Sequence, residues 1–227
     1  MTDLVVPFPP PPNPAASPVV IAGMYHSGTS MLAECLHRQG VRMWTDEWGQ
    51  VRDDKQVGKT FCECRRAWDI NDAEMRRNPI KVYADRMGYN YTPTPQFRAD
   101  LVQYRKAREV EANGQAWGVK EPRIATYVDG WLGAFRGSKM ILCLRNPGRV
   151  AETRVNRGHG TNPLVTLVTY NFTVGRTLTL LNDEPQIDAF LWIYERTEAE
   201  HCAQQKALRA FLGMPEFDYM GSFKRER

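Results

Sequence analysis

A short segment rich in hydroxyl groups joins two apolar stretches near the start of the sequence. The segment is His26-Ser27-Gly28-Thr29-Ser30; an apolar run precedes it over residues 19–22, and apolar residues at helical spacing follow it. The pattern predicts a strand, a loop and a helix. Backbone N–H groups and the positive end of a helix dipole at such a loop attract anions. The segment is therefore a candidate anion site, with simple helix capping and turn formation as the alternative.

The spacing of two glycines indicates which kind of anion this loop binds. Gly23 and Gly28 have the G-x-x-x-x-G spacing of a loop that binds nucleoside triphosphates, but Thr29-Ser30 follows where that loop has Lys-Ser or Lys-Thr. The lysine of that loop reaches the β- and γ-phosphates. Its absence argues against an ATP- or GTP-hydrolysing site and indicates a ligand with one phosphate, or with a phosphate that carries one substituent.

A second anion-binding pattern follows a later apolar segment. Arg145 comes directly after the apolar residues 139–144, and Thr153 lies eight residues further on, within a predicted helix. A guanidinium fork and a hydroxyl one or two helical turns away can hold the same phosphate. Ligands of open α/β sheets bind at the carboxyl ends of the strands, where this arginine is expected.

Together the two patterns resemble those of the sulfotransferase family, which uses 3′-phosphoadenosine 5′-phosphosulfate as its sulfuryl donor. The resemblance implies that residues 26–30 bind the 5′-phosphosulfate, and that Arg145 and Thr153 bind the 3′-phosphate. His26 stands where the family usually has a lysine or arginine, Asn146 replaces an aspartate, and Thr153 replaces a serine. Further segments resemble family motifs in the same order along the chain: "GKTFCECRRAWDIND", "WGVKEPRI", "IYE" and "LRAFLGMP".

Three side chains are candidates for the chemistry of sulfuryl transfer. The resemblance places Glu63 near the acceptor, where a carboxylate in a half-buried cleft can act as general base; a surface pair with Arg66 is its alternative role. His26 is a second candidate base or, preferably, a donor to the bridging oxygen of the leaving phosphate. Lys120 ends a predicted strand and is a reserve cation, with a surface pair to Glu121 as the alternative.

Alternating strands and helices must position these residues. The sequence predicts strands over 18–24, 116–122, 139–145 and 189–195. It predicts helices over 29–39, 62–77, 96–113 and about 164–181 and 198–212, a helix from near Val150, and a helical turn over 127–135, with Trp68 and Ile70 facing the core. This order predicts an α/β protein with a three-layer parallel sheet flanked by helices. The family resemblance makes it a P-loop NTPase-like sulfotransferase fold.

Composition favours one domain and excludes several partners. A single domain is predicted over 19–227, after a proline-rich flexible tail over 1–18. The net charge of +4 is spread along the chain, which suits a small anion better than a nucleic acid. No apolar run is long enough for a membrane helix, no signal peptide is recognisable, and Cys62 and Cys64 lack the partners of a zinc site. We therefore expect a cytoplasmic protein with no metal and no membrane partner.

The leading functional hypothesis is transfer of a sulfuryl group to a hydroxyl or amine of a small-molecule or carbohydrate acceptor. A P-loop nucleotide or metabolite kinase is an alternative, which the missing loop lysine disfavours. A catalytically inactive nucleotide-binding protein is another, suggested by His26. The loops over 45–60 and 89–95 are expected to set acceptor specificity. Trp44, Trp48 and Tyr194 are candidates to stack on adenine or line the acceptor site, with core packing as the alternative. His159 lies on a glycine-rich loop that is a candidate to close over the nucleotide, with an exposed loop histidine as the alternative. The acceptor and the oligomeric state stay open.

Overall fold

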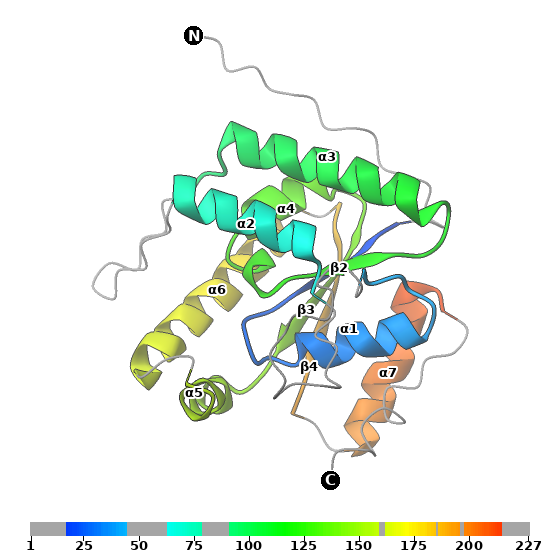
Figure 1. Cartoon of the computed structure of the whole chain (residues 1–227). Coiled ribbons are helices and arrows are strands. Elements are labelled where there is room, and N and C mark those ends of the chain that lie inside the picture. Colours follow the sequence, from blue (N-terminus) through cyan, green and yellow to red (C-terminus); the bar gives the residue numbers. More distant parts are fainter. Residues whose placement is uncertain are drawn as a thin grey trace.

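Four parallel strands form the sheet at the centre of the fold. The computed structural model describes residues 17–44, 63–78, 91–158, 162–184, 186–195 and 198–214. The strands are β1 (Val19–Ala22), β2 (Gly118–Lys120), β3 (Lys139–Leu144) and β4 (Asp188–Ile193), in the order β2-β1-β3-β4 (Figure 1). All described neighbours in the sheet pair in parallel, so their carboxyl ends share one edge. The predicted parallel α/β fold is confirmed.

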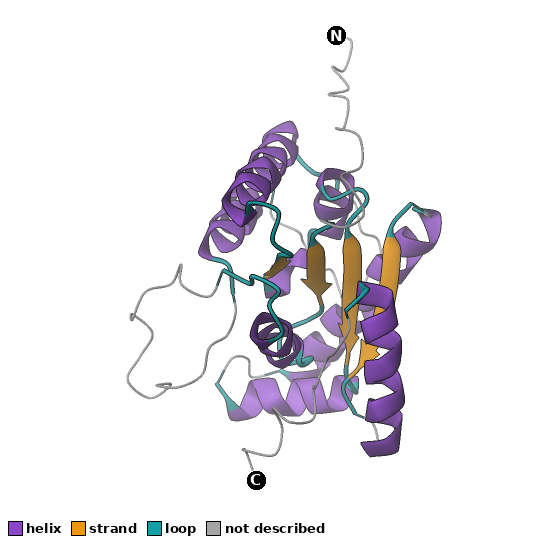
Figure 2. Cartoon of the chain, turned by 90° about the vertical axis from the view of Figure 1, so that its right-hand side faces the viewer, coloured by secondary structure: helices purple, strands orange, loops and turns teal. Residues whose placement is uncertain are grey.

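Helices connect the strands and cover both faces of the sheet (Figure 2). Parallel strands need such crossover connections, because a tight turn joins only antiparallel neighbours. The helices are α1 (Thr29–Arg38), α2 (Arg65–Arg77), α3 (Pro95–Ala112), α4 (Val128–Ala134), α5 (Pro147–Asn156), α6 (Pro163–Asp183) and α7 (Glu198–Leu212), with a 3₁₀ turn, η4 (Pro122–Ile124).

The uninterrupted apolar composition of β1 follows from burial on both faces. Val19 and Ile21 pack in one hydrophobic cluster with Leu32 and Leu36 of α1. Val20 and Ala22 point to the opposite face and belong to a larger cluster with residues of α3, η4 and α4. Successive side chains of a strand alternate between faces, so an apolar residue is needed at every position of β1.

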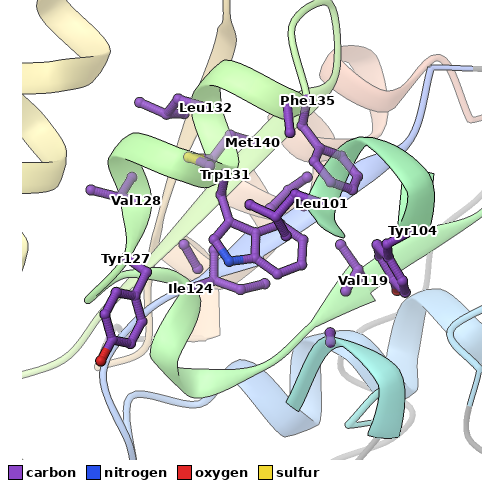
Figure 3. Packing of buried hydrophobic residues seen from close by; sticks show 14 of the residues in the cluster. Leu101, Tyr104, Val119, Ile124, Tyr127, Val128, Trp131, Leu132, Phe135 and Met140 are labelled. Atoms are coloured by element: carbon purple, nitrogen blue, oxygen red, sulfur yellow. The ribbon is translucent and has the colours of Figure 1, made fainter. Parts of the chain in front are cut away.

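The larger cluster is rich in aromatic side chains (Figure 3). Trp131 of α4 is fully buried, and its ring centroid lies 5.1 Å from that of Phe135 and 6.0 Å from that of Tyr104. The indole Nε1 of Trp131 donates to Oδ1 of Asn71 at 2.9 Å. The core therefore fixes α2 against α4, and with it the segment that carries Glu63 immediately before α2.

The phenol of Tyr127 predicts how stability depends on alkaline pH. Burial raises the pKa of Tyr127 from 10.0 to about 12, with Arg123 opposing the shift. Between these values the folded state keeps a proton that the unfolded state loses, so the free energy of unfolding falls as pH rises. We expect Tyr127→Phe to lose about 1.4 kcal/mol less stability than the wild type between pH 9 and pH 11, measured by urea denaturation. Parallel pH profiles of the two proteins would contradict this prediction.

Two details of the helices differ from prediction. Helix α5 begins at Pro147 rather than near Val150, because the side-chain oxygen of Asn146 accepts hydrogen bonds from the backbone N–H groups of Gly148 and Arg149 and caps the helix. In α2, Ile70 is half-buried and packs against the larger core cluster as predicted, whereas the half-buried Trp68 lies against the guanidinium of Arg123. The most buried positions of α2 are Ala67, Asn71, Asp72 and Glu74. They are largely polar, because the polar side chains hydrogen-bond to polar and charged groups of the neighbouring elements.

Several predicted features lie outside the described residues. These are residues 1–16 of the predicted tail, the loop over 45–60, residues 89–90 of the segment 89–95, Cys62, Trp48 and His159. Pro18, the last residue of the predicted tail, is described, and its carbonyl oxygen accepts a hydrogen bond from the backbone N–H of Lys139 at 2.9 Å. Within the described part of the chain, no helix combines the length and the apolar character that a membrane crossing requires.

Candidate functional site

The loop between β1 and α1 is shaped by a local turn and by Gly28. The hydroxyl of Ser27 donates to the carbonyl oxygen of Met24 at 2.6 Å, and the backbone N–H of Ser27 donates to the same oxygen at 3.1 Å. Gly28 precedes α1 with a φ of 89°, in the left-handed region that favours glycine. Ser27 is fully buried and Thr29, the first residue of α1, is nearly so. The turn thus places the amino end of α1 at the carboxyl edge of the sheet.

Gly28 also allows a close approach by the ring of Tyr194, which directly follows β4. A Cβ atom built on Gly28 would lie 2.3 Å from Cδ2 of Tyr194. The loop after β1 and the end of β4 are therefore in direct contact, although the two residues are far apart in the sequence.

We expect Gly28→Ala to lower the free energy of unfolding by more than Gly40→Ala does. Gly40 has a φ of 92° and open space around its Cβ position, so its substitution adds backbone strain of about 1–3 kcal/mol without a clash. Gly28→Ala adds comparable strain and also pushes against Tyr194. Chemical denaturation of the two variants isolates the contact with Tyr194, and equal losses would show that the ring does not constrain the loop.

Lys120 brings together three of the residues singled out in the sequence. Its Nζ donates to Oγ of Ser30 at 2.9 Å and lies 2.9 Å from Oε1 of Glu63. The three side chains come from the end of β2, the first turn of α1 and the residues before α2. Lys120 is 1% exposed and Glu63 9%, so the ion pair is largely removed from water. A buried ammonium thus reaches the hydroxyl-rich loop from the neighbouring strand.

A network of buried charges supports the strand end that carries Lys120. Glu121 is fully buried; its carboxylate accepts hydrogen bonds from Nε and the backbone N–H of Arg123 and from the side-chain amide of Asn71. Burial raises the pKa of Glu121, and Arg123 opposes the rise. Arg123 also pairs with Asp72 at 3.3 Å. The charged face of α2 is therefore tied to η4 and to the carboxyl end of β2.

Arg145 lies at the carboxyl end of β3 and joins three elements. Its Nη1 donates to the backbone oxygen of His26 at 2.8 Å, and its Nε donates to Oε1 of Glu195 at 3.1 Å. Its backbone N–H donates to the hydroxyl of Tyr170 on α6 at 2.9 Å. The guanidinium carbon is 4.9 Å from the centre of the Tyr194 ring. Arg145 is therefore held beside the loop that contains the first predicted anion site.

Thr153 and His26 are the two remaining candidate site residues. Thr153 lies on α5, and its hydroxyl donates to the carbonyl oxygen of Arg149 one turn earlier, at 2.7 Å. His26 is half-buried with a φ of 68°, which is uncommon for a residue other than glycine. The backbone of His26, through its contact with Arg145, links the two predicted anion sites.

Tyr25, in the loop before α1, has a perturbed phenol that the sequence did not predict. Burial raises its pKa to about 12, the carboxylates of Glu121 and Glu63 add to the rise, and Arg123 and Arg154 oppose it. The guanidinium of Arg154 lies 5.9 Å from the centre of its ring. Tyr25 is 37% exposed, so its burial is partial.

Glu195, Tyr170 and the Asn71–Glu121 contact were also missed. Glu195 follows an apolar strand in the same way as Arg145, so the rule that drew attention to Arg145 would have identified it. Tyr170 and Asn71 lie within helices, where the sequence carries no comparable signal. Within the described residues, no group of three or more histidine, cysteine, aspartate or glutamate side chains is arranged to hold a metal ion.

The fold is that of the sulfotransferases. A sulfotransferase from Mycobacterium avium superposes with a TM-score of 0.52 at 13% identity, over 91% of this chain and 66% of its own length. One from Mycobacterium tuberculosis gives 0.52 at 12%, over 93% and 72%. The sulfotransferase domain of a Synechococcus olefin synthase gives 0.55 at 16%, over 96% and 81%.

These likenesses are structural, because no protein-family model and no curated protein sequence matches the chain. The chain spans slightly less than two thirds of the Mycobacterium avium protein.

Proposed function

We propose that the protein transfers a sulfuryl group from 3′-phosphoadenosine 5′-phosphosulfate to a hydroxyl or amine of a small-molecule or carbohydrate acceptor. The observation that carries the proposal is the position of Lys120 between Ser30 of the loop and Glu63. The Lys120 ammonium and the Glu63 carboxylate, a candidate base, therefore lie together beside a loop that is suited to binding anions. The sulfotransferase fold supports this assignment.

The residues present fit such a donor. The backbone N–H groups at the start of α1 and the hydroxyl of Ser30 are suited to the 5′-phosphosulfate, and Lys120 supplies the positive charge that the loop itself lacks. Gly28 keeps the loop free of a Cβ on the side where Tyr194 packs. Among the described residues Nη2 of Arg145 has no hydrogen-bond partner, so its N–H groups remain for the 3′-phosphate.

Glu63 is the proposed general base. Its carboxylate takes the proton of the acceptor hydroxyl or amine while the acceptor oxygen or nitrogen bonds to sulfur and the bond from sulfur to the phosphate oxygen breaks. Lys120, the loop N–H groups and His26 are the proposed donors to the phosphate oxygen that leaves with the nucleotide. Because Lys120 contacts both Glu63 and Ser30, one side chain aligns the base with the donor-binding loop.

The two alternatives make different demands on this site. A kinase of related fold would have to bind a nucleoside triphosphate without a lysine in the loop. An inactive nucleotide-binding protein would keep the donor site but carry out no transfer. Both are distinguished from the proposal by measurements of binding and turnover.

Calorimetric titration with 3′-phosphoadenosine 5′-phosphate, AMP, ADP and ATP tests the donor. We expect the 3′-phosphorylated nucleotide to bind at least about tenfold more tightly than AMP, because a charge-assisted hydrogen bond contributes about 1.5–3 kcal/mol. Tightest binding of ATP would support the kinase and overturn the proposal. A protein that binds none of the four nucleotides would also contradict it.

A further inference from the structure

Glu195 bridges the side chain of Arg145 and the backbone that follows it. One carboxylate oxygen, Oε1, accepts a hydrogen bond from Nε of Arg145 at 3.1 Å, and the other, Oε2, accepts one from the backbone N–H of Asn146 at 2.5 Å. The side chain of Asn146 in turn caps α5. A single carboxylate thus holds both the guanidinium and the chain at the amino end of α5.

Strand pairing fixes the position of this carboxylate. Leu144 and Ile193 are paired at the ends of β3 and β4, and the backbone N–H of Tyr194 continues the ladder to the carbonyl oxygen of Leu144 at 2.9 Å. Continued past the strand ends, the same register sets Tyr194 beside Arg145 and Glu195 beside Asn146. From there the carboxylate of Glu195 meets the backbone N–H of Asn146 and the side chain of the preceding Arg145. The contact follows from the register of the sheet rather than from a chance encounter of two surface chains.

Two of the three guanidinium nitrogens of Arg145 donate hydrogen bonds to protein atoms. Glu195 occupies Nε, the backbone oxygen of His26 occupies Nη1, and within the described chain Nη2 is left without a protein partner. The ring of Tyr194 lies 4.9 Å from the guanidinium carbon and restricts it further. An arginine held at two of its nitrogens loses little further conformational freedom when a ligand binds at the third.

We propose that Glu195 is a positioning residue, which orients Arg145 so that its unoccupied N–H groups receive the 3′-phosphate of the nucleotide. This inference rests on the proposed function, because it concerns the same nucleotide site. Glu195 itself makes no contact with the nucleotide in this account. Its carboxylate acts on nucleotide binding only through Arg145, and its hydrogen bond with the backbone N–H of Asn146 holds the carboxylate in place.

The test compares two ligands that differ only in the 3′-phosphate. We expect Glu195→Ala to bind 3′-phosphoadenosine 5′-phosphate about tenfold more weakly than the wild type and to bind AMP equally well, in calorimetric titrations. Glu195→Gln keeps an oxygen acceptor at the same position and is expected to recover part of the loss. Glu152→Ala is the matched control, because Glu152 is an exposed carboxylate on α5 that pairs with Arg149 and not with Arg145.

A second variant separates positioning from general destabilisation. In an Arg145→Ala background, Glu195→Ala is expected to cause no further loss of affinity, because its effect passes through the missing arginine. Equal weakening for both nucleotides would indicate a structural role and overturn the inference. Tighter binding of the 3′-phosphorylated nucleotide by Glu195→Ala would do so too, since it would show that the carboxylate competes with the phosphate.

The failure of this inference is distinct from the failure of the proposed function. If the wild type binds the 3′-phosphorylated nucleotide and Arg145→Ala binds it weakly, unchanged affinity in Glu195→Ala removes Glu195 alone. If the wild type does not distinguish the 3′-phosphorylated nucleotide from AMP, the nucleotide site itself is wrong and the inference falls with it.

Discussion

Arg145→Ala is expected to weaken the binding of 3′-phosphoadenosine 5′-phosphate by roughly 2–5 kcal/mol, the range for removing one partner of a buried charged pair. The guanidinium is held at Nε by Glu195 and at Nη1 by His26, so it is already oriented when the phosphate arrives. Alanine removes both the charge and the fork. Calorimetric titration measures the change, and AMP, which lacks the 3′-phosphate, should bind with nearly wild-type affinity.

Arg149→Ala is the matched control for this change. Arg149 lies one turn into α5, is 65% exposed and pairs with Glu152, so its removal alters the local charge by the same amount without touching Arg145. We expect it to change the affinity by less than about 1 kcal/mol, as for exposed ion pairs. An Arg145→Ala protein with wild-type affinity would show that the 3′-phosphate site has been placed wrongly.

Glu63→Gln is expected to lower the rate of transfer by about 100-fold or more while nucleotide affinity is retained, because a general base contributes about 10²–10⁴-fold. The amide oxygen of glutamine can still accept the hydrogen bond from Lys120, so the contact between Lys120 and the loop is preserved while the base is lost. Steady-state rates and calorimetric affinities, measured on the same preparation, separate these two effects.

Glu34→Gln provides the control for Glu63→Gln. Glu34 is a part-exposed carboxylate on α1 that pairs with Arg38, away from Lys120. Its substitution should leave the rate within about twofold of the wild type, as is usual for surface changes. Equal activity of Glu63→Gln and the wild type would remove Glu63 from the mechanism.

The strands and the loop after β1 could be predicted because they depend on residues that are neighbours in the sequence. The apolar residues of β1 and β3 require a sheet covered on both faces, and the hydroxyl-rich loop must begin a helix there. The position of Arg145 also followed from the sequence, since it directly succeeds a buried strand. These features depend on residues that are neighbours in the chain.

The contacts that assemble the site depend on tertiary packing instead. Lys120 and Ser30 are 90 residues apart, and only the pairing of β2 with β1 brings them together. Helical periodicity placed Ile70 against the core, where it lies. It could not reveal the buried polar positions of α2, because their partners, Glu121 and Arg123, belong to a distant part of the chain. Glu195 reaches Arg145 through the register of β3 and β4.

The roles of Glu63, His26, Lys120 and Thr153 remain predictions that the geometry supports unequally. Glu63 and Lys120 are in contact beside the loop, as a base and a cation for sulfuryl transfer should be. Thr153 uses its hydroxyl within α5, so it must rotate to meet a phosphate. The backbone of His26 holds Arg145, which gives this residue a place in the site whatever its side chain does.

Transfer of radiosulfur from labelled 3′-phosphoadenosine 5′-phosphosulfate to a panel of hydroxyl- and amine-bearing acceptors, including carbohydrates, tests the central claim most directly. The account predicts that label appears in at least one acceptor class, with one equivalent of the 3′,5′-bisphosphate released for each sulfuryl group transferred, and that Glu63→Gln abolishes most of this transfer. Tight binding of the nucleotide by the wild type without transfer to any acceptor would contradict the account and identify an inactive nucleotide-binding protein.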